Sequence, residues 1–352
     1  MYSLPWDLGD KHLQKAAESC YTWTGKMSDM GRINLDAPRY SQAEFVGRFK
    51  HFLAITDWRL CFKTNRDLDE ANDLLQKYRS GQEPPGTPDE QIWYAKQLYE
   101  SAFHPDTGEK QNVLGRMSFQ VPGGMLMTGA LLTFYRTTPA VIFWQWANQS
   151  FNALVNFTNR NAKSALSVQQ LGVAYVSATS AALVTAIGLK SFLAGRASSL
   201  LQRYVPFAAV ASANCINIPF MRQNELIQGI PVSDRDGNEL ANSRAAAAKG
   251  ISLVVFSRIL MAAPGMTLLP VVMERLEKQR WLRNNPRLNA PFQILACGVS
   301  LTLMVPISCA LFDQTSSMST SSLAWLEPEA HSQLVKKCGD GVPDLVYFNK
   351  GL

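Results

Sequence analysis

The chain has 352 residues, 47% of them hydrophobic, a net charge of +6 and a mean hydropathy of −0.07. This average conceals a segregation, because 17 of the 28 acidic residues precede residue 110 and none lies in residues 110–224. The nine basic residues of that interval fall mostly between apolar runs and form no stripe with aromatic residues, which argues against a nucleic-acid-binding protein. A low-dielectric environment penalises ions and keeps basic residues near anionic headgroups, so the sequence predicts a polytopic protein of an anionic lipid membrane.

No motif indicates an enzyme, a cofactor or a metal site. The six cysteines are scattered without a CxxC pair, no Ser/His/Asp or Cys/His arrangement stands out, and no glycine-rich phosphate-binding loop is present. Residues 1–33 contain neither the apolar core of a secretory signal nor the acid-poor composition of a mitochondrial presequence. We treat them as an extension to which the sequence assigns no role.

Residues 34–115 are predicted to form a soluble helical module. Asp67 and Glu70 have the spacing of a capping box, in which each side chain satisfies a free backbone N–H of the other residue. The helix that they begin is expected to end near Arg79. A second helix is expected to begin with Pro88 at its first helical position.

Residues 116–312 are predicted to form the transmembrane domain, with about five crossing helices. A single helix over 121–157 would be about 55 Å long, too long for a hydrocarbon core of about 30 Å. The stretch Arg136–Pro139 interrupts it, so a short or tilted first piece should precede a second piece. Every apolar run contains small or polar residues, which is typical of transporters and channels. The further runs are Val168–Leu189, Val205–Met221, Ile251–Met273 and Ala290–Phe312.

Two polar segments complete the chain. Residues 222–250 are predicted to form a loop with a turn at Asp234–Asn238, and residues 313–352 a polar C-terminal tail. The fold class that follows is all-α, a polytopic membrane helix bundle with a soluble helical module at its N-terminal side.

Five amide side chains form a stripe on the helix that begins near Pro139. At about 100° per residue they fall within about 60° of one line, on a helix whose other faces are mostly aromatic. Such amides cost several kcal/mol in a membrane unless they are paired or hydrated. The stripe is either the lining of a path for a polar solute or an interhelical hydrogen-bond seam, and the spacing favours neither. Its members are Gln145, Asn148, Gln149, Asn152 and Asn156.

Two further amides lie one helical turn apart on a later run. Asn214 and Asn217 precede Pro219 among small residues. A closely packed helix that a proline breaks, with two amides at the break, is suited to form half of a substrate site. Simple compensation for the backbone groups that Pro219 frees is the alternative, and the pattern modestly favours it.

Arg258 lies seven residues into the apolar run that begins at Ile251, and no acidic residue lies nearby in the sequence. A substrate carboxylate is one natural partner, and an unwound break at Pro264-Gly265 would expose helix-end groups to the same substrate. The alternative, which the pattern favours, is an arginine that extends to the headgroups. The candidate hinges of a moving bundle are Pro139, Pro219, Pro264 and Gly265.

Several ordered motifs over residues 33–352 strongly resemble the sideroflexins. The stretches Gly123-Gly124 and Met273–Lys278 are most similar to the second paralogue type of that family. The motifs that carry the family resemblance are Ser101–Lys110, Phe134–Ala140, Trp144–Asn152, Val205–Ala209, Asn214–Pro219, Ser257–Gly265 and Tyr347–Leu352.

The resemblance implies a multi-pass protein of the mitochondrial inner membrane with five transmembrane helices. It implies transport of serine and related small neutral amino acids in support of one-carbon metabolism. For this paralogue type it also implies a link to mitochondrial iron and haem homeostasis.

We therefore hypothesise an amide-lined cavity that binds a zwitterionic amino acid and moves it by alternating access. Arg258 would face the carboxylate of that substrate. The rival hypothesis is a non-transporting membrane scaffold or regulator of mitochondrial iron and haem metabolism, in which residues 34–115 recruit protein partners and the stripe is an interhelical seam. Asn156 is a further substrate-binding candidate. In the transporter hypothesis the ammonium and hydroxyl groups are bound by Asn148, Asn152, Asn214 and Asn217.

Overall fold

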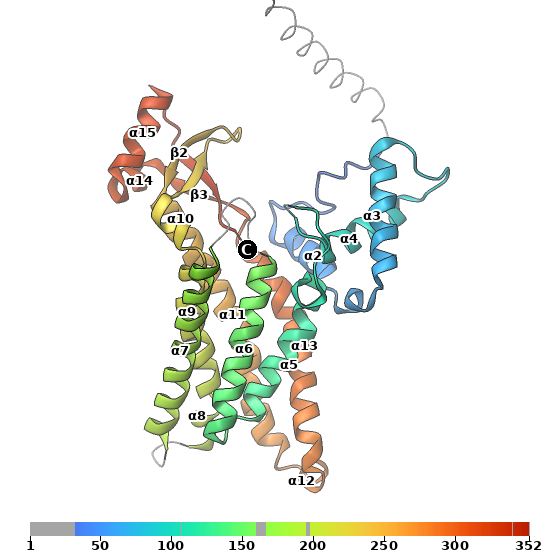
Figure 1. Cartoon of the computed structure of the whole chain (residues 1–352), viewed down its shortest axis with the longest axis vertical. Helices are drawn as coiled ribbons and strands as arrows, with labels where there is room; N and C mark the ends of the chain where they lie inside the picture. The colour runs from blue at the N-terminus through green and yellow to red at the C-terminus, as the bar shows by residue number, and fades with distance from the viewer. Residues whose placement is uncertain (1–31, 106, 160–166, 195–197, 340, 352) are drawn as a thin grey trace, which may run out of the picture.

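An antiparallel helical bundle forms the long axis of the molecule, and two polar parts lie at one end of it (Figure 1). One part is the N-terminal module and the other is a small sheet with flanking helices, so we call this end the sheet end. The opposite end carries the short helices α8 (Ser199–Gln202) and α12 (Arg280–Asn284), and we call it the α12 end. The computed structural model describes residues 32–105, 107–159, 167–194, 198–339 and 341–351, so the predicted extension 1–33 lies almost entirely outside the described residues.

The helices of the bundle alternate in direction between the two ends (Figure 1). Within the described residues, the four helices α7, α9, α11 and α13 are long and apolar enough to cross a membrane. The shorter α5 and the amide-bearing α6 complete the bundle, and the gap between them confirms the predicted interruption near Arg136. The predicted membrane helix bundle is therefore confirmed. Its helices are α5 (Gln120–Thr133), α6 (Thr138–Thr158), α7 (Val168–Leu193), α9 (Val205–Met221), α11 (Arg244–Leu276) and α13 (Asn289–Ala310).

Small residues bring α7 and α9 together as the most extensive helix pair of the bundle. The buried face of α7 carries alanine at every fourth position, and small side chains let two backbones approach closely in a membrane. On α9, Ala209 and Ala213 are at most 1% exposed. Thr185 of α7 donates a hydrogen bond of 3.0 Å to Ser212 of α9. The four alanines of α7 are Ala174, Ala178, Ala182 and Ala186.

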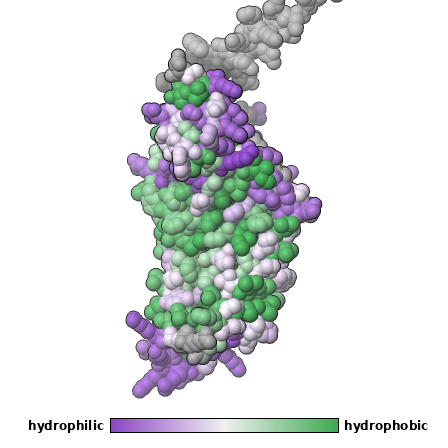
Figure 2. All heavy atoms as spheres, turned by 90° about the vertical axis from the view of Figure 1, so that its left-hand side faces the viewer, coloured by the Kyte–Doolittle hydropathy of each residue, from purple (hydrophilic) through white to green (hydrophobic). Residues whose placement is uncertain are grey.

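Exposed apolar side chains cover the outer surface of the bundle. Val184 on α7 is 72% exposed and Val299 on α13 is 68% exposed. On the face that Figure 2 shows, a hydrophobic band lies between two polar ends. Lipid acyl chains accept such a surface and water does not, so this band is the membrane-spanning part of the molecule.

The N-terminal module packs its helices around one apolar cluster. The helices α3 (Asn65–Ser80) and α4 (Asp89–Ala102) lie against each other and bury Leu68 and Ile92 completely. The helix α2 (Phe45–Ile55) packs instead against the C-terminal end of α13. The 3-10 turn η1 (Trp58–Phe62) connects α2 to α3, and the turns η2 (Val113–Gly115) and η3 (Met117–Phe119) connect the module to α5.

The helix starts of the module differ from the predicted ones. The side chain of Thr64 accepts from the N–H of Asp67, and the carboxylate of Asp67 accepts from the N–H of Thr64, so the capping box lies three residues earlier than predicted. Thr64 takes this role because its backbone is extended, as an N-cap requires. Pro88 is the N-cap of α4 and not its first helical residue. Gly81 ends α3 in the left-handed conformation that glycine favours, with φ of 71°.

The segments predicted as a polar loop and a polar tail fold together into an antiparallel sheet of strand order β2-β1-β4-β3. The predicted turn closes the β1–β2 hairpin, where the carboxylate of Asp234 accepts from the N–H groups of Asp236 and Asn238. Val346 and Phe348 form the core beneath it. The sequence analysis did not predict this sheet. Its elements are β1 (Ile230–Ser233), β2 (Glu239–Ser243), β3 (Thr315–Ser319) and β4 (Leu345–Asn349), with α10 (Gln223–Gln228), α14 (Thr320–Leu326) and α15 (Pro328–Cys338) beside them.

Buried cations from both polar parts meet at the C-terminal end of α13. Arg48 of α2 is 7% exposed, donates from Nε to the carbonyl of Ala310 at 2.9 Å and pairs with Asp313. Lys350, which follows β4 and is 4% exposed, donates from Nζ to the carbonyl of Phe312 at 2.6 Å. The last carbonyls of a helix have no partner inside it and carry partial negative charge. Arg48 therefore satisfies the last carbonyl of α13, and Lys350 satisfies a carbonyl two residues beyond that helix. Together they join both polar parts to the bundle.

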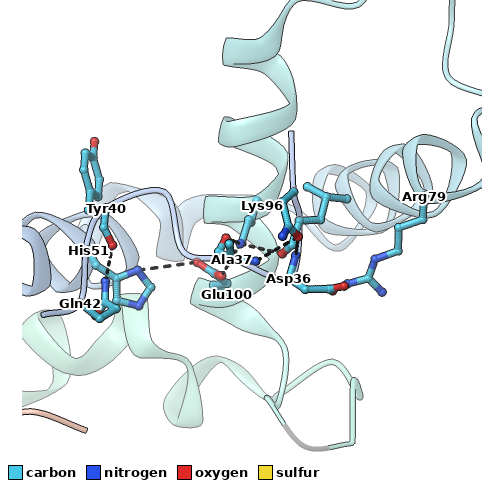
Figure 3. A network of polar contacts seen from close by, with 10 residues as sticks. Asp36, Ala37, Tyr40, Gln42, His51, Arg79, Lys96 and Glu100 are labelled. Carbon is cyan, nitrogen blue, oxygen red and sulfur yellow. Dashed lines mark hydrogen bonds and ion pairs between the residues drawn. The ribbon is translucent and has the colours of Figure 1, made fainter. Parts of the chain in front are cut away.

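A polar network holds the segment before α2 against α4 (Figure 3). Lys96 of α4 donates from Nζ to the carbonyls of Leu35 and Ala37 at 2.7 and 2.6 Å, and lies 3.6 Å from Glu100. Nδ1 of His51, on α2, is 4.0 Å from Oε2 of Glu100. Burial raises the pKa of Glu100, while burial and the charge of Lys96 lower the pKa of His51 below its ordinary value of 6.5.

Replacing Arg48 tests the junction at the end of α13. In Arg48→Met the carbonyl of Ala310 and the carboxylate of Asp313 lose their buried partner. We expect the free energy of unfolding to fall by about 3 kcal/mol, visible as a lower thermal midpoint of the detergent-solubilised protein. Arg66→Met is the matched control, because Arg66 forms an exposed ion pair with Glu70 that contributes little to stability. Equal midpoints in the two variants would refute the role of Arg48.

The lowered pKa of His51 predicts a loss of stability at acid pH. The unfolded chain protonates His51 near pH 6.5, whereas the folded protein keeps it neutral to lower pH. Between those two values the unfolded state binds more protons, so stability declines as pH falls below 6.5. The raised pKa of Glu100 has the opposite effect on the pH dependence of stability, and Glu100 is present in both the wild type and the variant His51→Gln. We expect the thermal midpoint to fall less steeply in His51→Gln than in the wild type between about pH 7 and pH 5.5, and parallel curves would contradict the assignment.

Candidate functional site

The amide stripe occupies the buried face of α6. Gln145, Asn148 and Gln149 are 1%, 7% and 3% exposed. Asn152 and Asn156, nearer the sheet end, are half-buried. The helical period thus identified which face of α6 points into the bundle, because an amphipathic helix turns its polar stripe away from lipid.

Three buried atoms of the stripe have no hydrogen-bond partner in the described part of the chain. They are Oε1 of Gln145, Nδ2 of Asn148 and Nε2 of Gln149. Leaving a buried polar group unmatched costs about 1–3 kcal/mol. A seam between helices would match these groups to side chains of a neighbour, as Ser150 of the same helix does with Tyr175 of α7 at 2.8 Å. The three atoms therefore keep hydrogen-bonding capacity that the described neighbours do not use.

A cavity of about 280 Å³ opens beside the stripe at the α12 end. Helices α5, α6, α7 and α9 contribute to its wall, and Gln145 is the member of the stripe that lines it. Apolar walls with a few polar groups are typical of a small-molecule site. The apolar lining comes from Leu131, Phe134, Val141, Trp144, Ala186, Val205 and Pro206, and the other polar lining residues are Tyr135, Arg136, Lys190, Gln202 and Arg203.

Arg203 is a buried cation of this cavity, 9% exposed. Its guanidinium donates to Oε2 of Glu277 at 2.6 Å, and its Nε has no partner within the described residues. Asn289 donates to the other carboxylate oxygen of Glu277 at 2.8 Å. The carboxylate of Glu277 is thus held by two donor residues, and the guanidinium of Arg203 retains one N–H donor for a second anion.

The mouth of the cavity is positively charged. Arg136 and Lys190 line it together with Arg203, and Glu277 is engaged by Arg203. Nζ of Lys190 donates to the carbonyl of Arg136 at 2.7 Å, which holds the end of α7 against the α5–α6 turn. Arg203 also interacts electrostatically with Glu274, so three cations face two carboxylates, and the excess positive charge favours a ligand with a negatively charged group.

The predicted amides of α9 do not line this cavity. Asn217 is 5% exposed and Asn214 is half-buried, both in the half of α9 nearer the sheet end. Pro219 lies two residues before the last residue of α9. The carbonyl that this proline leaves without its helical donor is that of Cys215, one turn earlier within α9.

Arg258 lies far from the cavity along α11. Glu277, the partner of Arg203, directly follows the last residue of α11. It comes 19 positions after Arg258, which corresponds to about 28 Å along the helix at 1.5 Å per residue. The half-buried side chain of Arg258 is close enough to Cys309, near the end of α13, to interact with it electrostatically. The structure thus brings Arg203 to the cavity and places Arg258 toward the sheet end.

The candidate hinges occupy different parts of their helices. Pro139 lies in the first turn of α6, where a proline is accommodated without strain. The helix α11 continues through Pro264 and Gly265, which corrects the predicted unwound break. Gly265 is buried, and a Cβ at that position would lie 3.3 Å from Oγ of Ser300 on α13. This glycine therefore permits a close helix contact instead of a break.

Sequence reasoning missed Arg203 and Lys190 as cavity residues. Each lies near the end of an apolar run, where basic residues are ordinarily assigned to headgroup contacts. A signal for Arg203 was available, because the run that ends near Met273 is followed by Glu274 and Glu277. Antiparallel helices place these acids at the same end of the bundle as the start of α9.

Comparison with known proteins gives one family over most of the chain. The family model described as "Sideroflexins" matches residues 34–352. Sideroflexin-2 of Mus musculus is 58% identical over 324 residues, covering 92% of this chain and 99% of the relative. Sideroflexin-2 of Homo sapiens is 56% identical with the same coverage, and Sideroflexin-1 of Homo sapiens is 52% identical over 91% of this chain and 98% of the relative. No solved structure matches the chain.

Replacing an unmatched amide distinguishes a solute lining from a structural seam. In Gln149→Leu a buried amide without a partner becomes an apolar group of similar size. We expect the thermal midpoint to stay level or rise, since the cost of burying the amide disappears. A hydrogen-bonded seam predicts a loss of about 1–2 kcal/mol and a lower midpoint. Ser150→Ala, which removes the observed contact with Tyr175, is the control that should lower the midpoint.

Proposed function

The chain belongs to the sideroflexin family, and from this premise we propose that it carries serine and related small neutral amino acids across the mitochondrial inner membrane. Its helices make it a multi-pass membrane protein, and the family supports a carrier-type role. The substrate class is the one that the family resemblance implies. The feature of the site that supports it is the set of buried, unmatched amides of α6 beside a basic cavity.

The unmatched groups of the site complement a zwitterion. Oε1 of Gln145 is an acceptor without a donor, which suits an ammonium or hydroxyl group. Nδ2 of Asn148, Nε2 of Gln149 and Nε of Arg203 are donors without acceptors, which suit a carboxylate or hydroxyl oxygen. A small 2-amino acid with a hydroxyl side chain carries donors and acceptors of both kinds, and Gln145 and Arg203 are the two of these residues that line the cavity. The cavity of about 280 Å³ has room for such a molecule with ordered water.

The carboxylate of the proposed amino-acid substrate has two candidate partners, which lie at different heights along the bundle. The hypothesis from the sequence assigns it to Arg258, among half-buried groups toward the sheet end. The cavity assigns it to Arg203, whose guanidinium is buried, lines the cavity and has a donor to spare. We propose Arg203 as the carboxylate partner when the α12 end is open, with the amide stripe leading from it toward Arg258.

The cellular role follows from the substrate class. A serine carrier of the inner membrane would feed mitochondrial one-carbon metabolism. We propose that the link to iron and haem homeostasis is an indirect consequence of this transport. The proposed chemistry needs neither a cofactor nor a covalent intermediate, since binding and release of the solute are sufficient.

Uptake of radiolabelled L-serine into liposomes reconstituted with the full chain tests the proposal. We expect saturable uptake that alanine and cysteine compete, and an increase in the thermal midpoint of the protein when serine is added, because the ligand binds the folded state. Neither uptake nor a shift from correctly inserted protein would favour the alternative, a non-transporting membrane scaffold or regulator.

Arginine variants locate the carboxylate partner. We expect Arg203→Gln to lower the ratio of maximal uptake rate to KM by about tenfold or more, as the loss of a charged hydrogen bond of about 1.5–3 kcal/mol requires. Arg275→Gln is the matched control, since Arg275 is exposed at the same end of the bundle and lines no part of the cavity. Loss of uptake in Arg258→Ala with normal uptake in Arg203→Gln would indicate that Arg258, and not Arg203, binds the substrate carboxylate.

A further inference from the structure

The helix α2 has an apolar arc that is only half covered. Phe52 and Ile55 pack against Ala310 at the end of α13. At about 100° per residue the adjoining arc is also apolar, yet it is exposed, and Lys50 marks its polar edge. The exposed side chains of that arc are Phe45, Val46 and Leu53, which are 43%, 57% and 40% exposed.

The turn η1, which follows α2 in the chain, exposes two further aromatic residues. Trp58 and Phe62 are 44% and 74% exposed, and their rings meet edge to face at 6.2 Å. Arg59 lies between them and pairs with Asp57 at 2.7 Å, so its charge is largely compensated. The two elements together present apolar and aromatic side chains with little net charge. We call Phe45, Val46, Leu53, Trp58 and Phe62 the outer face of the module.

The outer face lies at the level where the membrane ends. The span that includes α13, Pro286–Ala310, has 25 residues and is about 37 Å long, which exceeds a hydrocarbon core of about 30 Å. The last turns of α13 therefore reach the headgroup region. α2 packs against these turns, with its Arg48 bonded to the carbonyl of Ala310, and lies beside the end of the bundle (Figure 1).

The outer face is continuous with the lipid-facing surface of α13. Leu295, Val299 and Leu303 form an exposed row at every fourth position of that helix, 62%, 68% and 53% exposed. Ala310, seven residues beyond Leu303, is completely covered, and α2 packs against it. Seven residues correspond to about 10 Å, so the apolar surface of α2 begins where the apolar row of α13 ends.

We propose that α2 and η1 dock into the lipid leaflet at the sheet end, as an interfacial amphipathic element that anchors the N-terminal module to the membrane surface. The side chains of the outer face lie at the boundary of headgroups and acyl chains, where such helices bury their apolar side by about 5–10 Å. Trp58 occupies the position typical of interfacial aromatic residues. Lys50 extends toward the phosphates from the edge of the arc.

A second copy of this chain is the competing occupant, and the position of the outer face favours lipid. An apolar surface at headgroup level meets lipid in every membrane, without a partner of matching shape. Because Asp57 compensates Arg59, the docking should depend on apolar area more than on lipid charge. Docking is therefore expected in vesicles of phosphatidylcholine alone, as well as in vesicles that contain anionic lipid.

A photoreactive benzophenone amino acid in place of Phe62 or Leu53 identifies what covers the outer face. Both side chains are exposed, so the replacements leave the core of the module intact. The full chain is reconstituted into phosphatidylcholine vesicles, irradiated and analysed by mass spectrometry. Trp325 is the matched control position, because it is apolar and 82% exposed on α14, away from the bundle (Figure 1).

We expect lipid adducts at both positions, severalfold above the yield at position 325 and little changed by anionic lipid. Cross-linked dimers in place of lipid adducts would overturn the proposal in favour of a second copy. A yield no higher than at position 325 would place the outer face in water and overturn it as well. The measurement does not depend on uptake, so its outcome is separate from that of the transport experiment.

Discussion

The carbonyl end of α13 is the point on which the arrangement of the three parts of this molecule depends. A helix that ends in a buried place leaves carbonyl groups that need donors. Here Arg48 donates to the last carbonyl of α13, and Lys350, from the other end of the chain, donates to the carbonyl of Phe312 two residues beyond it. Arg222 at the end of α9 donates in turn to the carbonyl of Lys350 at 2.7 Å. Each contact requires the other segments in place, so the N-terminal module, the sheet and the bundle hold one another at the sheet end.

At the opposite end of the bundle, buried cations depend on acidic residues that are distant in the sequence. Residues 110–224 contain no acid, so any buried cation of α6, α7 or α9 must find its counter-ion elsewhere. Arg203 finds it in Glu277, 74 residues later, and Glu277 is in turn held by Asn289. Two carboxylates, Glu277 and Glu274, interact with Arg203, so they do not balance all three cations of the cavity. The excess positive charge remains at a mouth lined by Arg136 and Lys190, where a carboxylate is the natural complement.

The sequence predicted the features that depend on the periodic spacing of apolar and polar residues. It identified the apolar runs and the buried stripe of α6, because these depend on residue type and on the helical repeat alone. It could not predict the sheet, since β1 and β4 are each five residues or fewer and pair across more than a hundred positions. Sequence reasoning proposed Arg258 as the carboxylate partner because it lies within an apolar run, and it did not propose Arg203. Which end of the bundle an arginine serves depends on helix direction and on partners distant in sequence, as the pairing with Glu277 illustrates.

The two ends together constrain how a carrier of this design would work. The amide stripe runs from Gln145 to Asn156, eleven positions and about 16 Å along α6, so it offers a solute similar hydrogen bonds at successive levels. A solute that enters at the α12 end would exchange one set of amides for the next without crossing a purely apolar stretch. The capped end of α13 lies toward its exit. Release at the sheet end would therefore require the contacts of Arg48 or Lys350 to loosen, which links the stability of that junction to the rate of transport.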